Sequence, residues 1–413
     1  MTDAIRKPPV THWARLMAVA GPGLVVMLAD TDAGSVITAA QSGAEWGYRL
    51  LLFQLILVPI LFVVQELTVR LGIVTGKGHA ELITEHFGRS WAWVSVAALI
   101  LACLGALLSE LSGLAGAGAL FGVPKLLTMA LAVGMLITMA VTGSYLSIER
   151  IAICVGLFEL LFIYVAWRAN PAGGELAMGL FDIPIANPKY LYLVSANIGA
   201  VIMPWMVFYQ QSSVVEKGLT TDDMPAARID TAVGALLTQL IMAAVLVATA
   251  ATIGKAGGGA ALDTVEQIAG ALTPFLGPTT GKLAFALAIS GSAVVATIVV
   301  TLTAARTVGE VLRVPHRLDA APRDAKWFYG VYALALLAGA GIVASGVDLV
   351  AISVGVQILN ALLLPLVLGF LFLLAQRLPE PWRLQGRYAV VVAVTMGVTA
   401  VFGVYAAVVG LVG

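Results

Sequence analysis

The chain of 413 residues is rich in apolar side chains and poor in charge. Hydrophobic residues make up 60% of it, charged residues 11%, and the formal net charge is zero. A soluble globular domain carries about a quarter charged residues. The composition therefore excludes an ordinary soluble protein and a basic nucleic-acid-binding protein. It indicates one all-α polytopic domain over residues 1–413, with the lipid bilayer as its surroundings and no obligate protein partner.

Long apolar runs separated by polar or helix-breaking residues predict eleven transmembrane helices. A run of about 20 apolar residues crosses the hydrocarbon core of a bilayer, which is about 30 Å thick. Between the runs lie segments rich in Gly, Pro or charge, such as 170–174, 257–259 and 315–322. The predicted spans are 16–41, 50–74, 91–118, 125–146, 150–168, 190–214, 228–254, 281–308, 327–346, 349–376 and 387–412.

Positive charge is distributed unequally between the two sides of this layout. Cytoplasmic loops of membrane proteins retain an excess of Lys and Arg. Of the 23 Lys and Arg residues, 17 fall on the side of the N-terminus. The six on the other side are Arg49, Lys125, Arg168, Lys189, Lys255 and Lys282. We therefore expect a multi-pass protein of the cell membrane with a cytoplasmic N-terminus and an extracytoplasmic C-terminus.

Two carboxylates, Asp30 and Asp32, lie in the middle of the first predicted span. A charged side chain at this depth is costly and marks a functional site unless a partner neutralises it. Gly34 follows closely and weakens the helix. We interpret this segment as a cation-binding site at an interrupted helix.

A second interruption is predicted five spans later, around Pro204. Proline has no N–H, so the carbonyl of Ala200 loses its helical partner and becomes available to a ligand. Paired interruptions in corresponding spans are typical of transporters built from inverted repeats. The halves would be 16–168 and 190–376, with 387–412 as an extra helix. Taken singly, each interruption is equally compatible with a kink or a helix-packing position.

The two segments resemble the metal-binding motifs of the NRAMP divalent-metal transporters. In the first span, Gly21-Pro-Gly23 is followed by Asp32-Ala-Gly-Ser35 and by the run Gln41-Ser-Gly-Ala-Glu-Trp-Gly-Tyr48; in the sixth, residues 199–204 read Gly-Ala-Val-Ile-Met-Pro. The resemblance extends through all eleven spans. It implies a LeuT-like fold of five plus five helices in which helices 1 and 6 are broken.

The resemblance also implies a set of metal ligands. The family's ligand positions fall on Asp32, Ser35, the carbonyl of Ala200, Met203 and Gln357. Asp30 is an additional acid, which would ligate through water, make the site more negative, or accept a hydrogen bond from the broken helix.

Departures from the family pattern concern proton transfer. Trp205 and Gln210 stand where the family has histidines, the side chains best suited to proton exchange near neutral pH. Glu110 remains as a proton carrier if the alignment takes a one-residue gap; without the gap Ser109 takes that position. These three positions, Glu110, Trp205 and Gln210, are the proton or gating candidates, and the losses imply weak or absent proton coupling.

The same departures, with the double acid Asp30-Thr-Asp32, are closest to the NRAMP-related magnesium transporter branch. Met203 is a departure from that branch, which usually has a small residue at this position, and a thioether favours softer ions than Mg²⁺. As an alternative, Met203 is simply a packing residue.

The expected function is secondary transport of divalent cations, Mg²⁺ or Mn²⁺ or both, by alternating access. The metal would be a substrate, and no cofactor is expected. An alternative on the same scaffold is a carrier for a small organic solute such as an amino acid or an amine, with a degenerate metal site; a channel is a third possibility. No nucleophile–base arrangement or phosphate-binding loop indicates an enzyme.

Overall fold

The computed structural model describes residues 21–142, 150, 154, 157–254, 261–262, 264–312 and 326–412, and within these ranges the secondary structure is helical. The first part contains α2 (Pro22–Asp30), α3 (Ala33–Trp46), η1 (Gly47–Leu50), α4 (Leu51–Thr75), α5 (His79–Phe87), α6 (Arg89–Ala119), α7 (Lys125–Thr142), η2 (Leu157–Glu159), α9 (Leu160–Arg168) and α10 (Gly173–Phe181). The second part contains α11 (Pro188–Val201), α12 (Pro204–Glu216), η3 (Thr221–Asp223), α13 (Met224–Thr249), η4 (Ala250–Gly254), α15 (Val265–Leu276), α16 (Pro278–Leu312), α17 (Lys326–Ala344), α18 (Leu349–Ala375) and α19 (Gly386–Val412).

Among the described residues, eight helical segments are long and apolar enough to cross a membrane. One of them joins α3 to α4 over Ala33–Thr75, another joins α11 to α12 over Pro188–Glu216, and Tyr329–Ala344 is a shorter apolar helix. The all-helical membrane architecture predicted from the apolar runs is therefore confirmed. The number of eleven spans stays a prediction, since parts of spans 125–146 and 150–168 lie outside the described residues.

The helix of the first span is interrupted directly at the acids. α2 ends at Asp30 and α3 begins at Ala33, with Asp32 in an extended conformation (φ −67°, ψ 171°). The Asp32 side chain caps α3 by accepting the N–H of Ser35 at 2.6 Å. The expectation that Gly34 weakens the helix was wrong in its position, because Gly34 lies within α3. Its lack of a side chain instead admits Gln357 and Ser109, which a Cβ at Gly34 would strike.

A second interruption separates α11 from α12. Ile202 and Met203 have non-helical dihedrals, and Pro204 is the first residue of α12. This is where proline fits a helix, since the first N–H of a helix has no internal partner. Gly199, one turn before the interruption, packs so closely on α18 that a Cβ there would overlap the backbone of Gln357.

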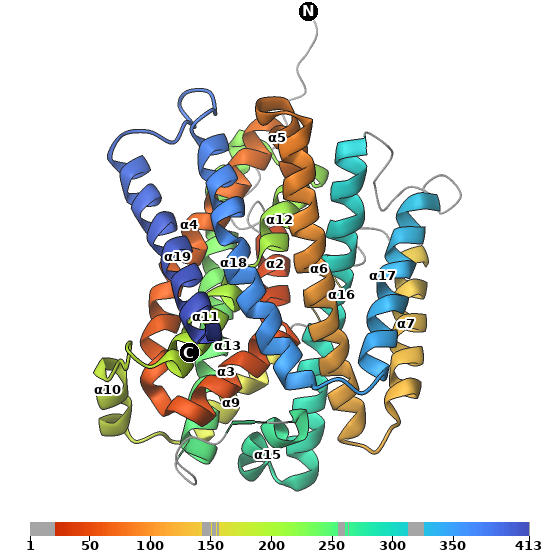
Figure 1. The fold of residues 1–413 in the computed structure, drawn as a ribbon, viewed down its shortest axis with the longest axis vertical. Coiled ribbons are helices and arrows are strands. Elements are labelled where there is room, and N and C mark those ends of the chain that lie inside the picture. The colour runs from red at the N-terminus through yellow and green to blue at the C-terminus, as the bar shows by residue number, and fades with distance from the viewer. Residues whose placement is uncertain are drawn as a thin grey trace, which may run out of the picture.

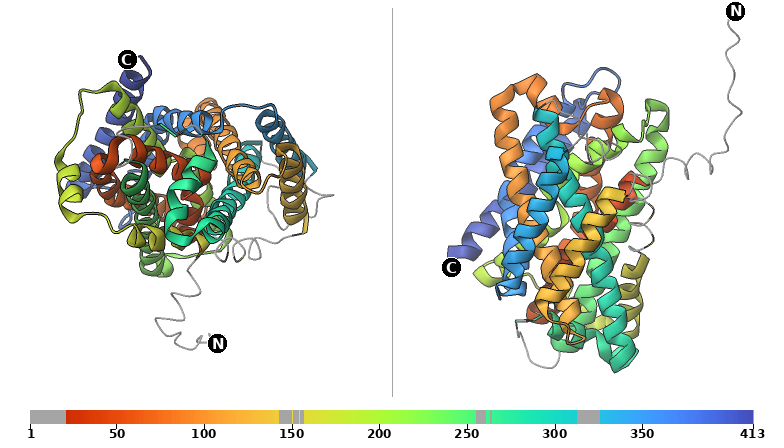
Figure 2. Two further views of the ribbon diagram at one scale, coloured as in Figure 1. Left: turned by 90° about the horizontal axis from the view of Figure 1, so that it is seen from below. Right: turned by 90° about the vertical axis from the view of Figure 1, so that its right-hand side faces the viewer.

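The interrupted helices lie in the interior of the bundle. Figure 1 shows α2, α11, α12 and α13 near its middle, while α7 and α17 pack together at one edge, and the end-on view agrees (Figure 2). Three short helices, α5, α10 and α15, occupy predicted connections, which is a correction to the sequence analysis. The start of α15 is stabilised by a capping box, in which the side chains of Thr264 and Gln267 each accept the backbone N–H of the other residue.

Replacing Gly199 by Ala tests the close approach of α11 and α18. The added methyl group has only backbone to displace, so we expect a loss of stability of about 1–3 kcal/mol or more. The measurement is thermal unfolding of the purified protein in detergent. Gly355→Ala in α18 is the matched control, since a Cβ there meets nothing within 4 Å and no loss is expected. Equal melting temperatures for Gly199→Ala and the unsubstituted protein would contradict the contact.

Candidate functional site

The two helix interruptions meet at Ser35. Its hydroxyl donates a hydrogen bond of 3.0 Å to the carbonyl oxygen of Ala200, which is 165 residues away in the sequence. In an unbroken helix this carbonyl would receive the N–H of residue 204, which Pro204 lacks. Asp32 is adjacent, since one of its oxygens binds the N–H of Ser35. Three predicted ligand positions, Asp32, Ser35 and Ala200, are thus brought together.

Three further acids surround Asp32. Glu110 on α6 accepts the backbone N–H of Ala33, the residue that follows Asp32, at 3.1 Å. Glu159, at the end of η2, is hydrogen-bonded to the hydroxyl of Thr31. Asp30 is the last residue of α2, two positions before Asp32 in the chain. All four acids are at most 1% exposed.

Several oxygens of these acids have no hydrogen-bond partner among the described residues. They are both oxygens of Asp30 and one each of Asp32, Glu110 and Glu159. Buried acceptors without donors are costly, so native structures supply them with a proton, a water molecule or a cation. From sequence, Glu159 is a candidate gate or helix-end partner of the fifth span and not a predicted site residue. The available signal was a single acid in the apolar run 157–168.

Gln357 closes one side of this group. Its side chain lies against Gly34, where a Cβ would strike its amide nitrogen, and its oxygen accepts a hydrogen bond of 2.9 Å from Asn360. The amide nitrogen has no partner within the described residues. The structure thus places Gln357 beside the start of α3, and its role as a metal ligand stays a prediction.

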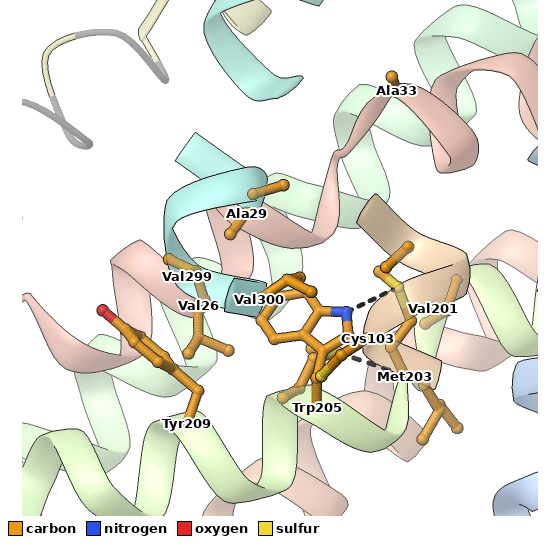
Figure 3. Packing of buried hydrophobic residues seen from close by; sticks show 14 of the residues in the cluster. Val26, Ala29, Ala33, Cys103, Val201, Met203, Trp205, Tyr209, Val299 and Val300 are labelled. Atoms are coloured by element: carbon orange, nitrogen blue, oxygen red, sulfur yellow. Dashed lines mark hydrogen bonds between the residues drawn. The ribbon is translucent and has the colours of Figure 1, made fainter. Parts of the chain in front are cut away.

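Met203 lies at the second interruption, and its sulfur is engaged by Trp205. The indole N–H donates to the thioether at 3.2 Å, and both side chains are fully buried. Figure 3 shows the indole among apolar side chains, with its nitrogen directed to the sulfur. In this arrangement Trp205 holds the thioether and carries no ionisable group.

Gln210 lies further along α12 and faces α13. Its amide nitrogen donates to the hydroxyl of Thr231 at 3.3 Å. Five residues of helix, about 7.5 Å, separate it from Trp205. Among the described residues Gln210 has no hydrogen bond to the acids around Asp32, so its proposed role in gating or proton transfer stays a prediction.

The arrangement suits a cation held by ligands of several kinds. Within the described ranges, no group of three His, Cys, Asp or Glu side chains is placed to hold a metal ion by itself. A carboxylate, a hydroxyl, a backbone carbonyl and an amide do converge at the two interruptions. Oxygen ligands of this type suit hard divalent cations.

Comparison with known proteins agrees with this geometry. The sequence profile described as natural resistance-associated macrophage protein-like (Nramp) matches residues 23–409. The chain belongs to the Nramp family. It is a family of membrane transporters, not of enzymes.

Curated Nramp relatives carry a functional name. The chain is 30% identical over 319 residues to the "Divalent metal cation transporter MntH" of Mesorhizobium japonicum, a match that covers 73% of this chain and 69% of the relative. It is 28% identical over 395 residues to the protein of the same name from Burkholderia ambifaria, covering 92% and 84% of the two chains.

Solved structures share the fold of this Nramp chain. The manganese transporter of Eremococcus coleocola, solved with an aromatic bis-isothiourea compound, superposes with a TM-score of 0.77 at 19% identity and covers 98% of this chain and 89% of its own. The nucleobase-cation-symport-1 transporter Mhp1 gives a TM-score of 0.63 at 15% identity, with coverages of 94% and 90%. MhsT in complex with L-phenylalanine gives 0.58 at 15%, with coverages of 95% and 97%.

Replacing Ser35 by Ala tests the contact between the interruptions in this Nramp chain. The substitution leaves the Ala200 carbonyl buried without a donor, so we expect a loss of about 1–3 kcal/mol in unfolding free energy. Thermal unfolding measures it. Ser353→Ala is the control, because this buried hydroxyl only bonds to the carbonyl of Leu349 in its own helix. A Ser35→Ala protein as stable as the control would contradict the contact.

Proposed function

We propose that this Nramp protein is a secondary transporter of divalent metal cations, with Mg²⁺ and Mn²⁺ as the expected substrates. The observation that carries the proposal is the hydrogen bond from Ser35 to the Ala200 carbonyl beside Asp32. It joins two helix interruptions inside an apolar bundle. The carboxylate oxygens there that lack hydrogen-bond partners would be stabilised by a bound cation. The names of the MntH relatives support the same substrate class.

The proposed ligands are Asp32, Ser35, the Ala200 carbonyl, Gln357 and Met203, with Asp30 nearby. The free oxygen of Asp32 supplies the negative charge, while the Ser35 hydroxyl and the Ala200 carbonyl supply neutral oxygens. Gln357 would have to turn its amide to ligate, because its nitrogen faces Gly34 and its oxygen accepts from Asn360. The sulfur of Met203 accepts a hydrogen bond from Trp205, which leaves one lone pair for a metal and makes the sulfur a weaker ligand. This arrangement favours an oxygen-rich shell, which suits Mg²⁺ and Mn²⁺ better than softer ions.

We further propose that the chain spans the cell membrane eleven times, in halves of five helices over 16–168 and 190–376 followed by 387–412. The paired interruptions and the distribution of positive charge support this topology. The N-terminus would face the cytoplasm, so the Asp32 end of α3 lies at mid-depth and its Trp46 end lies outside. Alternating access would then open the site first to the outside and later to the cytoplasm.

Uptake through this site would be driven mainly by the membrane potential. Each elementary charge gains about 2.3 kcal/mol per 100 mV of inside-negative potential, so a divalent cation gains twice that. The described histidines are poorly placed to carry protons through the site. His79, in the connection after α4, is buried against Gln211, and burial lowers its pKa to about 4. It therefore stays neutral near pH 7, and Glu110 is the main candidate for any proton movement.

Replacing Asp32 by Ala tests the substrate and the site together. In proteoliposomes the unsubstituted protein should take up Mn²⁺ or Mg²⁺ with saturation, and Asp32→Ala should abolish uptake because the central carboxylate is lost. Asp222→Ala, in the exposed turn η3, is the matched control and should transport normally.

Three outcomes would contradict the proposal. Unchanged transport by Asp32→Ala would remove Asp32 from the site. Uptake without saturation would indicate a channel. Failure to take up or bind either metal, together with uptake of an amino acid or amine, would favour the organic-solute alternative.

The driving force gives a separate prediction. Metal influx should rise steeply when a potassium gradient and valinomycin make the vesicle interior negative, and a pH-sensitive dye in the lumen should record no acidification. Acidification that follows metal influx and disappears in Glu110→Gln would instead establish proton coupling through Glu110.

A further inference from the structure

A cavity opens at the end of α3 remote from Asp32. It has a volume of about 770 Å³, and its lining includes Glu45, Trp46, Lys189 and Tyr192. We call it the Glu45 cavity. Of these four residues, two belong to α3, which Asp32 caps, and two belong to α11, which carries Ala200. The same pair of helices therefore connects the cavity with the candidate site.

A polar face runs along α3 between these two places. Ser35, Thr38, Ser42 and Glu45 are spaced by three, four and three residues, which places them on one side of the helix. The first three are fully buried. In a helix that packs inside an apolar bundle, such a face needs a function or polar partners.

A hydrogen-bonded chain of three side chains crosses this face. Gln54 on α4 donates to the side-chain oxygen of Asn197 on α11 at 2.6 Å, and the Asn197 amide nitrogen donates to the Ser42 hydroxyl at 2.8 Å. Asn197 makes a further hydrogen bond of 2.7 Å to the carbonyl of Leu193. All three side chains are fully buried. We call Gln54, Asn197 and Ser42 the amide chain.

The amide chain lies between the cavity and the site on both helices. On α3, Ser42 is about 4.5 Å along the axis from Glu45 and about 10 Å from Ser35. On α11, Asn197 follows Tyr192 of the cavity and precedes Ala200 of the site. An ion that moves from the cavity to Asp32 along the two helices must pass this point.

Two polar atoms beside the amide chain have no partner among the described residues. They are the side-chain oxygen of Gln54 and the hydroxyl of Thr38, both fully buried. Unpaired buried oxygens are uncommon, and along a predicted route they offer neutral ligands to a partly dehydrated cation. Water would supply both atoms with partners if this region opened.

We propose that the amide chain is the outer gate of the transporter. Opening requires the Asn197 amide to leave Ser42, after which the oxygens of Asn197, Ser42 and Thr38 face the route. This inference rests on the proposed function and on the proposed orientation, in which the Glu45 cavity is outside. The competing explanation is that the chain only ties α3, α4 and α11 together, as small polar residues often do between membrane helices.

The test measures access to the route without measuring transport. Thr38→Cys is introduced into a protein carrying Cys103→Ala and Cys154→Ala, and reconstituted protein is labelled from outside with a membrane-impermeant thiosulfonate. Asn197→Ala should accelerate labelling about fivefold, the shift expected for the loss of one hydrogen bond of about 1 kcal/mol. Ser42→Ala removes less volume and should act in the same direction.

Ser195→Ala is the matched control. This buried serine lies on the same helix, and its hydroxyl bonds to the carbonyl of Gly403 on α19 at 3.1 Å, away from the amide chain. It should leave the labelling rate unchanged. Equal rates with and without Asn197, or equal acceleration by Ser195→Ala, would overturn the gate and leave only helix packing.

The outcome is independent of the substrate. Labelling needs no metal, and Asp32→Ala in the same background should preserve the difference between the Asn197 and Ser195 variants. If no metal is transported but that difference remains, the gate stands and the substrate proposal fails. If metal is transported but the difference is absent, the reverse holds.

Discussion

The structure depends on how helix ends are satisfied where no water is available. In a membrane interior each backbone N–H and C=O needs an internal partner. At the first interruption Asp32 supplies a carboxylate for the N–H of Ser35, and at the second Pro204 brings no N–H that needs one. The remaining carbonyl of Ala200 is then satisfied across the bundle by the Ser35 hydroxyl. Two helix ends therefore complete one another, and the candidate site is the place where they do so.

The need to pair backbone groups at the helix ends explains why polar side chains concentrate at the two interruptions. The acids gather at the start of α3, where the first N–H groups of a helix attract negative charge. Glu110 uses this directly, since it accepts the N–H of Ala33. Glycine is used for a different purpose. Gly34 and Gly199 allow α18 to approach both interruptions, which brings Gln357 beside Asp32.

Much of the fold could be predicted from the sequence because apolar runs of membrane length have few alternatives. The segments around Asp32 and Pro204 were recognised for a related reason, since acids and proline are conspicuous in such runs. The exact position of the first interruption is set by Asp32, whose side chain caps α3. Helix propensities alone do not show which residue acts as the cap. Glu159 required three-dimensional information, because nothing in its local sequence indicates that Thr31 is its partner. The Ser35–Ala200 contact likewise joins residues 165 positions apart.

The contact of Gly199 with the backbone of Gln357 has a mechanical consequence. Because no side chain separates α11 from α18 at this point, the backbones are in direct contact, and we expect the Ala200 carbonyl and Gln357 to move together. If the proposed ligands change their spacing, the change is then expected on the other side of the site, where Asp30 ends α2 and Asp32 caps α3.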